Sequence, residues 1–269
     1  ALKPNFAEVH NSLGVTLKKL GRLKEAEASH AKAIDLKPDY AVAMLYLSTV
    51  QGYMNNLEAE IVSLQNVLRI DSDNDGLRAG VNLAICNFLE GNFDQSKKQV
   101  LAVKKIQEKT LPKFKNEKVY QGYLLKILKW HERNYLNFEK AKPHKTLQVI
   151  GESHSLASHY LRIKYSQINF FCKANLIKGC KQWHLGNSFR NEFKHQFENI
   201  FLSLPKYSYV LLTIGEIDCR LDSGIIEYQK KFQDKQIKKI ILSTIDDYLT
   251  YITNKNFTCQ HKIIIQGVP

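Results

Sequence analysis

A repeat of small and apolar residues in the first hundred positions is the feature that most constrains how this chain can fold. The pattern of residues 7–40 returns when the sequence is shifted by 34 residues, and again when it is shifted by 70. The clearest correspondences are Leu13-Gly14, Leu47-Ser48 and Leu83-Ala84. A helical hairpin of this size cannot bury its apolar face alone, so successive hairpins must stack. The spacing therefore predicts an α-helical solenoid over residues 1–108.

The first of these units resembles a tetratricopeptide repeat. Gly14, Ala26 and Pro38 stand where that family has a small residue in the first helix, a small residue in the second and a proline after it. The second unit resembles the family loosely and the third weakly. The resemblance implies a concave surface that binds a peptide or protein partner; the alternative is that the repeats only brace the next domain. Since residues 1–6 resemble the end of another repeat, we expect more repeats upstream.

Residues 109–144 are predicted to be a helical linker with one amphipathic helix, because apolar residues recur there at helical spacing. The net charge of the chain is +13, and 14 Lys and Arg stand against 4 Glu between Lys97 and Lys145. Such a band can attract an acidic partner, a membrane surface or nucleic acid, but we favour the simpler interpretation of a solvated helical linker. Since no nucleic-acid motif accompanies the charge, we do not expect a nucleic-acid partner.

The cysteines indicate a reducing compartment. The five are widely spread and form no Cys-x-x-Cys pair, which argues against a disulfide framework and against a zinc site. We therefore expect reduced thiols, a cytoplasmic location, and neither a metal nor a cofactor. No apolar run approaches the roughly 18 residues of a membrane-spanning helix, so no membrane span is expected.

The pattern changes at Lys145, where short apolar runs begin to alternate with longer helical stretches. The apolar runs are 147–150, 168–172, 209–214 and 262–265, and the helical stretches are 155–165, 187–204 and 224–253. Alternating strands and helices predict an α/β domain over residues 145–269, with a mainly parallel sheet between layers of helices. In such sheets, ligands bind beyond the carboxyl ends of the strands.

Polar residues follow two of these runs. The serine turn, Gly151–Ser155, comes after the first, and the acidic loop, Gly215–Arg220, comes after the third. Between them lies the segment 177–187, whose glycines let the backbone approach a ligand closely. If the strands are parallel, the serine turn and the acidic loop meet at one edge of the sheet. From this turn alone, two interpretations of the serine are equally supported: it is a nucleophile, or it is a helix N-cap.

The order of these motifs resembles the SGNH, or GDSL-type, hydrolases. Gly151-Glu152-Ser153 is similar to their Gly-Asp-Ser block, Gly179 to the glycine of their second block, and Gly215-Glu216-Ile217-Asp218 to their Gly-x-Asn-Asp block. The combination is especially similar to SGNH-like domains that follow tetratricopeptide repeats in bacterial proteins. The resemblance implies a three-layer α/β/α fold and an esterase or acyltransferase that acts on acyl or acetyl esters, for example of a carbohydrate.

The resemblance also implies roles for individual residues. Ser153 would attack the ester carbonyl, and the backbone amides of Ser153 and Gly179 would stabilise the oxyanion. A histidine would accept the serine proton, oriented by an aspartate. His184 is the internal candidate for the base and Asp218 for the aspartate. Glu152, Glu216 and Arg220 would support the site, and Gly151 would shape the turn.

Two departures from the family pattern leave an alternative open. The asparagine of the third block is Ile217 here, and Asn187 is the candidate replacement. The family's Asp-x-x-His block is absent, because no Asp in the sequence has a His three positions later. Either the block lies beyond Pro269, or the domain is degenerate and the protein is a non-catalytic, protein-binding scaffold. A third interpretation is that the parent protein acts in glycosylation, since repeats of this type also precede glycosyltransferase domains. Residues 145–269 contain no motif that resembles a sugar-nucleotide site.

Overall fold

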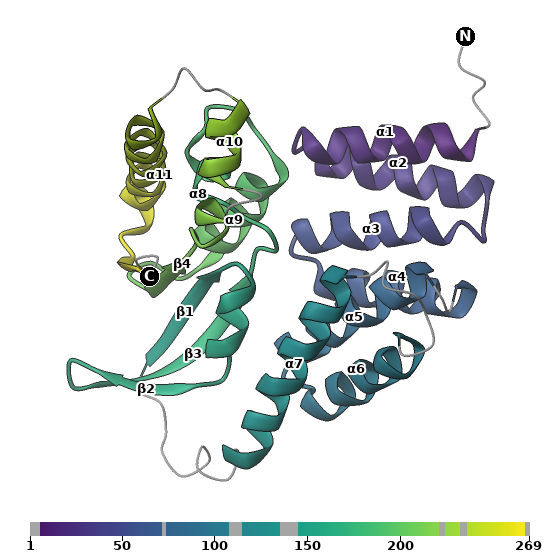
Figure 1. The fold of residues 1–269 in the computed structure, drawn as a ribbon, viewed down its shortest axis with the longest axis horizontal. Coiled ribbons are helices and arrows are strands. Elements are labelled where there is room, and N and C mark those ends of the chain that lie inside the picture. Colours follow the sequence, from purple (N-terminus) through teal and green to yellow (C-terminus); the bar gives the residue numbers. More distant parts are fainter. Residues whose placement is uncertain are drawn as a thin grey trace. The chain divides into compact units, whose positions relative to one another are not determined.

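The computed structural model describes residues 6–71, 74–107, 115–134, 145–220, 224–231 and 236–266. The chain divides into two compact units, Ala1–Ala141 and Lys142–Pro269. The first unit is helical and the second combines a sheet with helices, in keeping with the change of pattern at Lys145 (Figure 1).

In the first unit, helices α1 to α6 pair as antiparallel hairpins. Their bounds are α1 Ala7–Lys19 and α2 Leu23–Leu36, α3 Ala41–Tyr53 and α4 Leu57–Ile70, α5 Asn74–Leu89 and α6 Phe93–Gln107. Contacts of α2 with α3 and of α4 with α5 stack the hairpins in chain order, as Figure 1 shows. Additional contacts of α1 with α3 and of α3 with α5 place the first helices of the hairpins side by side on one face.

The same backbone conformation recurs in the turn of each of these hairpins. Gly21, Asn55 and Gly91 have φ values of +70°, +59° and +79°, the left-handed conformation that ends many helices. Glycine and asparagine adopt this conformation most easily. Asn55 lies 34 residues after Gly21, and Gly91 lies 70 residues after it, which are the two shifts of the sequence repeat. The periodicity of the sequence thus corresponds to a periodicity of the backbone.

Close packing explains the small residue in the first helix. A Cβ atom on Gly14 would lie 2.6 Å from Cε1 of His30, whose imidazole ring covers the glycine. His30 is fully buried, and its Nδ1 lies 2.9 Å from Oδ1 of Asn11. Its ring also stacks on Tyr46 of the next hairpin, with the ring centroids 5.8 Å apart. The imidazole therefore joins two helices of one repeat to the following repeat.

The amphipathic helix expected in residues 109–144 is α7, Lys115–Asn134. It packs on α5 and α6, and therefore belongs to the helical unit. Leu124 and Leu128 of this helix are buried. The buried imidazole of His131 stacks on Phe93 of α6, with centroids 4.8 Å apart.

The second unit contains a five-stranded sheet in the described residues, with the strand order β2-β3-β1-β4-β5. The strands are β1 Lys145–Gly151, β2 Arg162–Tyr165, β3 Ile168–Leu176, β4 Tyr209–Thr213 and β5 Lys262–Ile265. The helices are η2 Ser153–Ser158, α8 Gln182–Gly186, α9 Glu192–Ser203, η3 Ile217–Cys219, α10 Ile225–Lys231 and α11 Ile237–Cys259. The sheet is mixed: β1 pairs in parallel with β3 and β4, and β4 with β5, whereas β2 and β3 are antiparallel.

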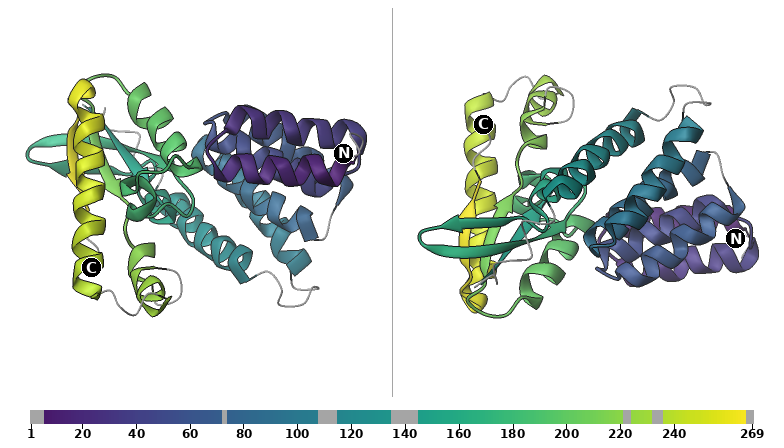
Figure 2. Two further views of the ribbon diagram at one scale, coloured as in Figure 1. Left: turned by 90° about the horizontal axis from the view of Figure 1, so that it is seen from above. Right: turned by 90° about the horizontal axis from the view of Figure 1, so that it is seen from below.

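The helix predicted over residues 155–165 is wrong. A short 3₁₀ helix, η2, ends at Ser158, and β2 follows as one strand of a hairpin with β3. Ser166 and Gln167 both have positive φ, +46° and +66°, as a two-residue hairpin turn requires. Cross-strand hydrogen bonding has overridden the helical spacing of the apolar residues. In both views of Figure 2 the tip of this hairpin projects beyond α11.

Alternating side chains bury the two faces of the central strands. Ile150, Val210 and Leu212 belong to one core, with Phe197 of α9 and Tyr248 of α11. A second, smaller core on the other face contains Leu147, Val149, Phe170 and Cys172. In register, Gly151 of β1 lies beside Leu176 of β3 and Thr213 of β4. Three parallel strands therefore end at the same edge, which we call the carboxyl edge.

Candidate functional site

The carboxyl edge brings the serine turn and the acidic loop together, as expected for parallel strands. Gly151 makes this possible, because a Cβ atom there would lie 1.9 Å from Oγ1 of Thr213 and 2.7 Å from its carbonyl oxygen. No side chain fits between the strands at this point. β1 and β4 therefore approach closely at Gly151, and the residue that follows, Glu152, reaches the acidic loop.

Glu152 is the buried centre of this edge, with a relative exposure of 1%. Its Oε1 accepts a hydrogen bond from the backbone N–H of Glu216 over 3.1 Å, whereas its Oε2 has no hydrogen-bond partner among the described residues. The pKa of the Glu152 carboxyl is raised to about 7, first by burial and then by the neighbouring Glu216 carboxylate. The amides of Glu216 and Ile217 and the guanidinium of Arg220 act in the opposite direction.

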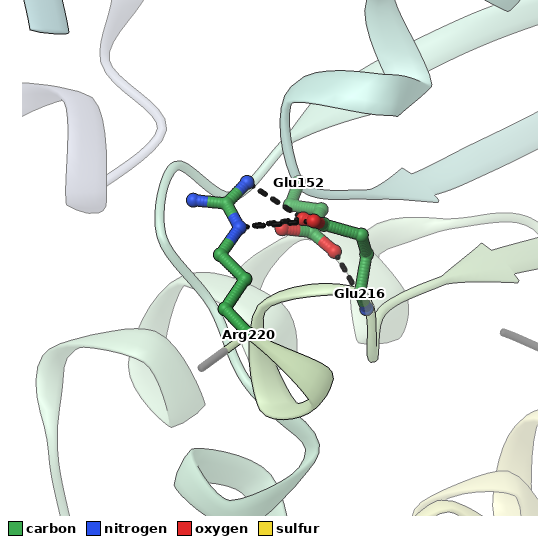
Figure 3. Close-up of polar contacts among 3 residues, drawn as sticks. All are labelled: Glu152, Glu216 and Arg220. Atoms are coloured by element: carbon green, nitrogen blue, oxygen red, sulfur yellow. Dashed lines mark hydrogen bonds and ion pairs between the residues drawn. The ribbon is translucent and has the colours of Figure 1, made fainter. Parts of the chain in front are cut away.

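Glu216 and Arg220 form an ion pair above Glu152. The Nε of Arg220 lies 2.9 and 3.0 Å from the two carboxylate oxygens of Glu216, and its Nη2 lies 2.6 Å from Oε2. Hydrogen bonding to Arg220 lowers the pKa of Glu216. Figure 3 shows the Glu152 and Glu216 carboxylates close together, with the guanidinium on the same side. One ionised carboxylate, one buried carboxyl and one guanidinium thus share a small volume.

The serine turn continues into η2. Ser153 is half-buried, His154 is exposed and Ser155 is fully buried. In the ranges that the structure describes, the Ser153 hydroxyl forms no hydrogen bond with an imidazole. The hydroxyl groups of Ser155 and Thr213 are buried without a hydrogen-bond partner in the same ranges. Sequence reasoning did not single out these two groups; the only signals were that Thr213 is the last residue of a strand and that Ser155 belongs to the serine turn.

Asp218 is buried and holds the start of α8. Its carboxylate accepts hydrogen bonds from the backbone N–H groups of Gln182, over 2.8 Å, and of Trp183, over 3.5 Å. A carboxylate at this position accepts hydrogen bonds from amides of the first helical turn, and the positive end of the helix dipole stabilises its charge. Burial raises the pKa of Asp218, and the two amides oppose that increase. The contacts of Asp218 therefore position α8 against the acidic loop.

His184 and Asn187 make local contacts within and just after α8. The Nδ1 of His184 accepts a hydrogen bond from the backbone N–H of Lys181 over 3.0 Å, and its ring stacks on Phe193 with centroids 4.0 Å apart. Burial lowers the pKa of His184 to about 4, and Lys181 contributes to this decrease. The Asn187 side chain donates to the Trp183 carbonyl over 3.0 Å. Both side chains therefore stabilise α8 and the loop between α8 and α9.

Gly179 lies in the turn that leads from β3 to α8. Its φ is +77°, and a Cβ atom there would have no heavy atom within 4 Å. The left-handed conformation favours glycine, and the open space leaves the backbone accessible. A cavity of about 710 Å³ lies nearby, lined among others by Lys181, Trp183, Asp218 and Tyr228. Its lining comes from α8, α10, α11 and the acidic loop, and not from the serine turn.

The helical unit offers a different kind of surface on its first helices. The Nζ of Lys18, on α1, lies 5.3 Å from the ring centroid of Tyr53, on α3. Tyr46, also on α3, is 36% exposed. Partly exposed aromatic rings beside a cation, on adjacent helices, are typical of surfaces that bind peptides.

Comparison with known proteins gives one family. Residues 7–40 match the tetratricopeptide repeat family, which confirms that part of the expected resemblance. No curated protein matches the sequence. Among the described residues, no helix has both the length and the apolar character needed to cross a membrane.

Proposed function

We propose that this protein is a protein-binding scaffold whose tetratricopeptide hairpins bind a peptide segment of a partner. The observation that carries the proposal is the family match over residues 7–40, together with the left-handed turn that recurs at Gly21, Asn55 and Gly91. Repeats of this family generally bind protein or peptide partners. The recurrent turn extends the same hairpin geometry to the two following pairs of helices, which gives a continuous surface on α1, α3 and α5.

Lys18 and Tyr53 are the residues through which this surface can be tested. A phage-displayed library of random peptides, selected on the purified full chain, should yield binding peptides. We expect Tyr53→Ala and Lys18→Ala to weaken their binding by about tenfold each, since both truncations remove contact area from the surface. Lys24→Ala, at an exposed position on α2, is the matched control and should bind as the wild type does. Failure to select any peptide, or equal binding by all variants, would contradict the proposal.

A second candidate, a serine esterase or acyltransferase, is favoured by the position of Ser153. It lies two residues after the end of β1 at the carboxyl edge, where Gly179 also presents an accessible backbone. In this candidate Ser153 is the nucleophile, the amides of Ser153 and Gly179 bind the oxyanion, and Asp218 holds α8 in place. His184, or a histidine outside this sequence, would supply the base, and Asn187 the additional oxyanion donor. The substrate would be an acyl ester.

Hydrolysis of p-nitrophenyl acetate by the full chain tests the second candidate. Wild-type protein should exceed the buffer rate, and Ser153→Ala should abolish the excess. Ser158→Ala, on the same short helix, serves as the control and should keep the activity. Equal rates for wild type and Ser153→Ala would exclude Ser153 as the nucleophile.

A further inference from the structure

The side chains of Glu152, His154 and Glu216 converge at the carboxyl edge. Each offers one ligand atom, and these atoms all lie within 4.8 Å of one another. Donors that share a metal ion at about 2.0–2.2 Å lie roughly 3.4 Å apart, so small rotations of the side chains close the set. His154 is exposed and Glu216 is half-buried, and both can rotate in this way. Glu152 is fixed by burial and by the amide of Glu216.

The unpaired oxygen of Glu152 is independent support for a ligand here. A buried carboxylate oxygen without a partner is costly, and such groups are nearly always hydrogen-bonded or bound to a metal. Oε2 of Glu152 is buried and unpaired in the part of the chain that the structure describes. The ligand atoms of Glu152 and Glu216 lie within 4.8 Å of each other, and Figure 3 shows the two carboxylates close together. A cation between the two would satisfy this oxygen and offset the repulsion of the two acidic groups.

Arg220 is the positive charge that balances the Glu216 carboxylate in this structure. Its guanidinium binds both oxygens of Glu216, but Oε2 of Glu152 has no hydrogen-bond partner. The guanidinium keeps its charge, and the Arg220 side chain is 44% exposed, so a divalent ion can compete with it for the Glu216 carboxylate. A divalent ion with three protein ligands would bind both carboxylates and the imidazole, and would keep an open position for water.

We propose that Glu152, His154 and Glu216 form a binding site for a divalent transition-metal ion such as Zn²⁺. The imidazole distinguishes this donor set from the all-oxygen sites that Mg²⁺ and Ca²⁺ prefer. The site lies in the second unit and does not depend on peptide binding by the repeats.

Cobalt(II) is the probe for a titration, because its visible absorption reports the number and kind of ligands. Full-length protein, first stripped with a chelator, should bind one Co²⁺ at the site, and Zn²⁺ should displace it. We expect His154→Ala and Glu216→Gln to weaken binding by at least about tenfold. Both residues lie near the surface, so these variants should fold, which circular dichroism checks. Glu152→Gln should weaken binding equally.

Three control variants make the test specific. Arg220→Gln should tighten binding several-fold, since it removes the competing cation. Cys219→Ser should bind Co²⁺ as the wild type does, because the exposed thiol beside the site is not a proposed ligand. His10→Ala, which removes an imidazole from α1, should also have no effect. Absence of Co²⁺ binding at about 100 µM, wild-type affinity in His154→Ala and Glu216→Gln, or loss of binding in Cys219→Ser would each overturn the proposal.

Discussion

The backbone N–H of Glu216 donates a hydrogen bond to the buried carboxylate of Glu152 over 3.1 Å, although the two residues are 64 positions apart. This bond joins the serine turn to the acidic loop and fixes the geometry of the carboxyl edge. It also requires the two strands to end level with each other, which depends on Gly151. The predictions below test this arrangement and the packing of the helical unit.

The first prediction concerns Gly151. We expect Gly151→Ala to lower the free energy of unfolding by at least about 2 kcal/mol, because the added methyl group would overlap Thr213. Urea unfolding of the full chain, followed by circular dichroism, measures this change. Gly122→Ala is the matched control: nothing lies within 4 Å of the added atom on α7, and alanine should stabilise that helix by about 0.5–1 kcal/mol. Wild-type stability of Gly151→Ala would contradict the close approach of the strands.

The second prediction concerns the pH dependence that Glu152 contributes. Its pKa in the folded protein is raised to about 7, from the ordinary value of 4.5. The folded state therefore binds the proton more tightly than the unfolded state does. The stability from this group is fully present below pH 4.5 and is lost as the pH rises through 7. Glu152→Gln cannot ionise, so the melting temperature of the variant relative to wild type should rise between pH 5 and pH 8.

Melting curves recorded with a chelator present measure this difference without a contribution from metal ions. Ser12→Ala, which removes an exposed group of α1 that does not titrate, is the control, and its difference from wild type should stay nearly constant over the same range. A constant difference for Glu152→Gln as well would show that the carboxyl group titrates alike in the folded and unfolded states.

The third prediction concerns His30. Burial lowers its pKa to about 4, from the ordinary 6.5, and Lys18 contributes to the decrease. The unfolded state therefore binds the proton more tightly, so the stability that neutral His30 contributes is present above pH 6.5 and is lost as the pH falls toward 4. Nuclear magnetic resonance of ¹⁵N-labelled imidazoles should show His30 neutral at pH 5.5. A midpoint near 6.5 would show that the ring is not buried between the repeats.

The fourth prediction concerns Asp218. We expect Asp218→Ala to lower the free energy of unfolding by about 1–2 kcal/mol, because amides at the start of α8 lose their acceptor. Hydrogen exchange should accelerate at the amides of Gln182 and Trp183. Asp246→Ala, at an exposed position on α11, should leave both quantities unchanged. Unchanged exchange at α8 in Asp218→Ala would show that the carboxylate does not hold this helix.

The sequence predicted the helical repeats because their signal is local and repeated. Each hairpin needs a small residue where helices cross and a residue that tolerates positive φ in its turn, as at Gly14 and Gly21. The same requirement recurs with every hairpin, so it is visible as a period. The hairpin of β2 and β3 was missed because pairing between strands decided its conformation, and the spacing of its apolar residues also fits a helix.

The sequence by itself determined that a helical unit precedes a unit with a sheet, and that the serine turn meets the acidic loop. The alternation of strands and helices predicts parallel strands, and the carboxyl ends of parallel strands share an edge. Only the tertiary structure decided what each polar group does there. The Asp218 carboxylate accepts from the amides of α8, and Nδ1 of His184 accepts from the backbone N–H of Lys181. Among the described residues, Oε2 of Glu152 is buried without a hydrogen-bond partner. These outcomes depend on burial and on distances of a few ångströms between segments that are far apart in the sequence. Such distances cannot be read from the pattern of residues along the chain.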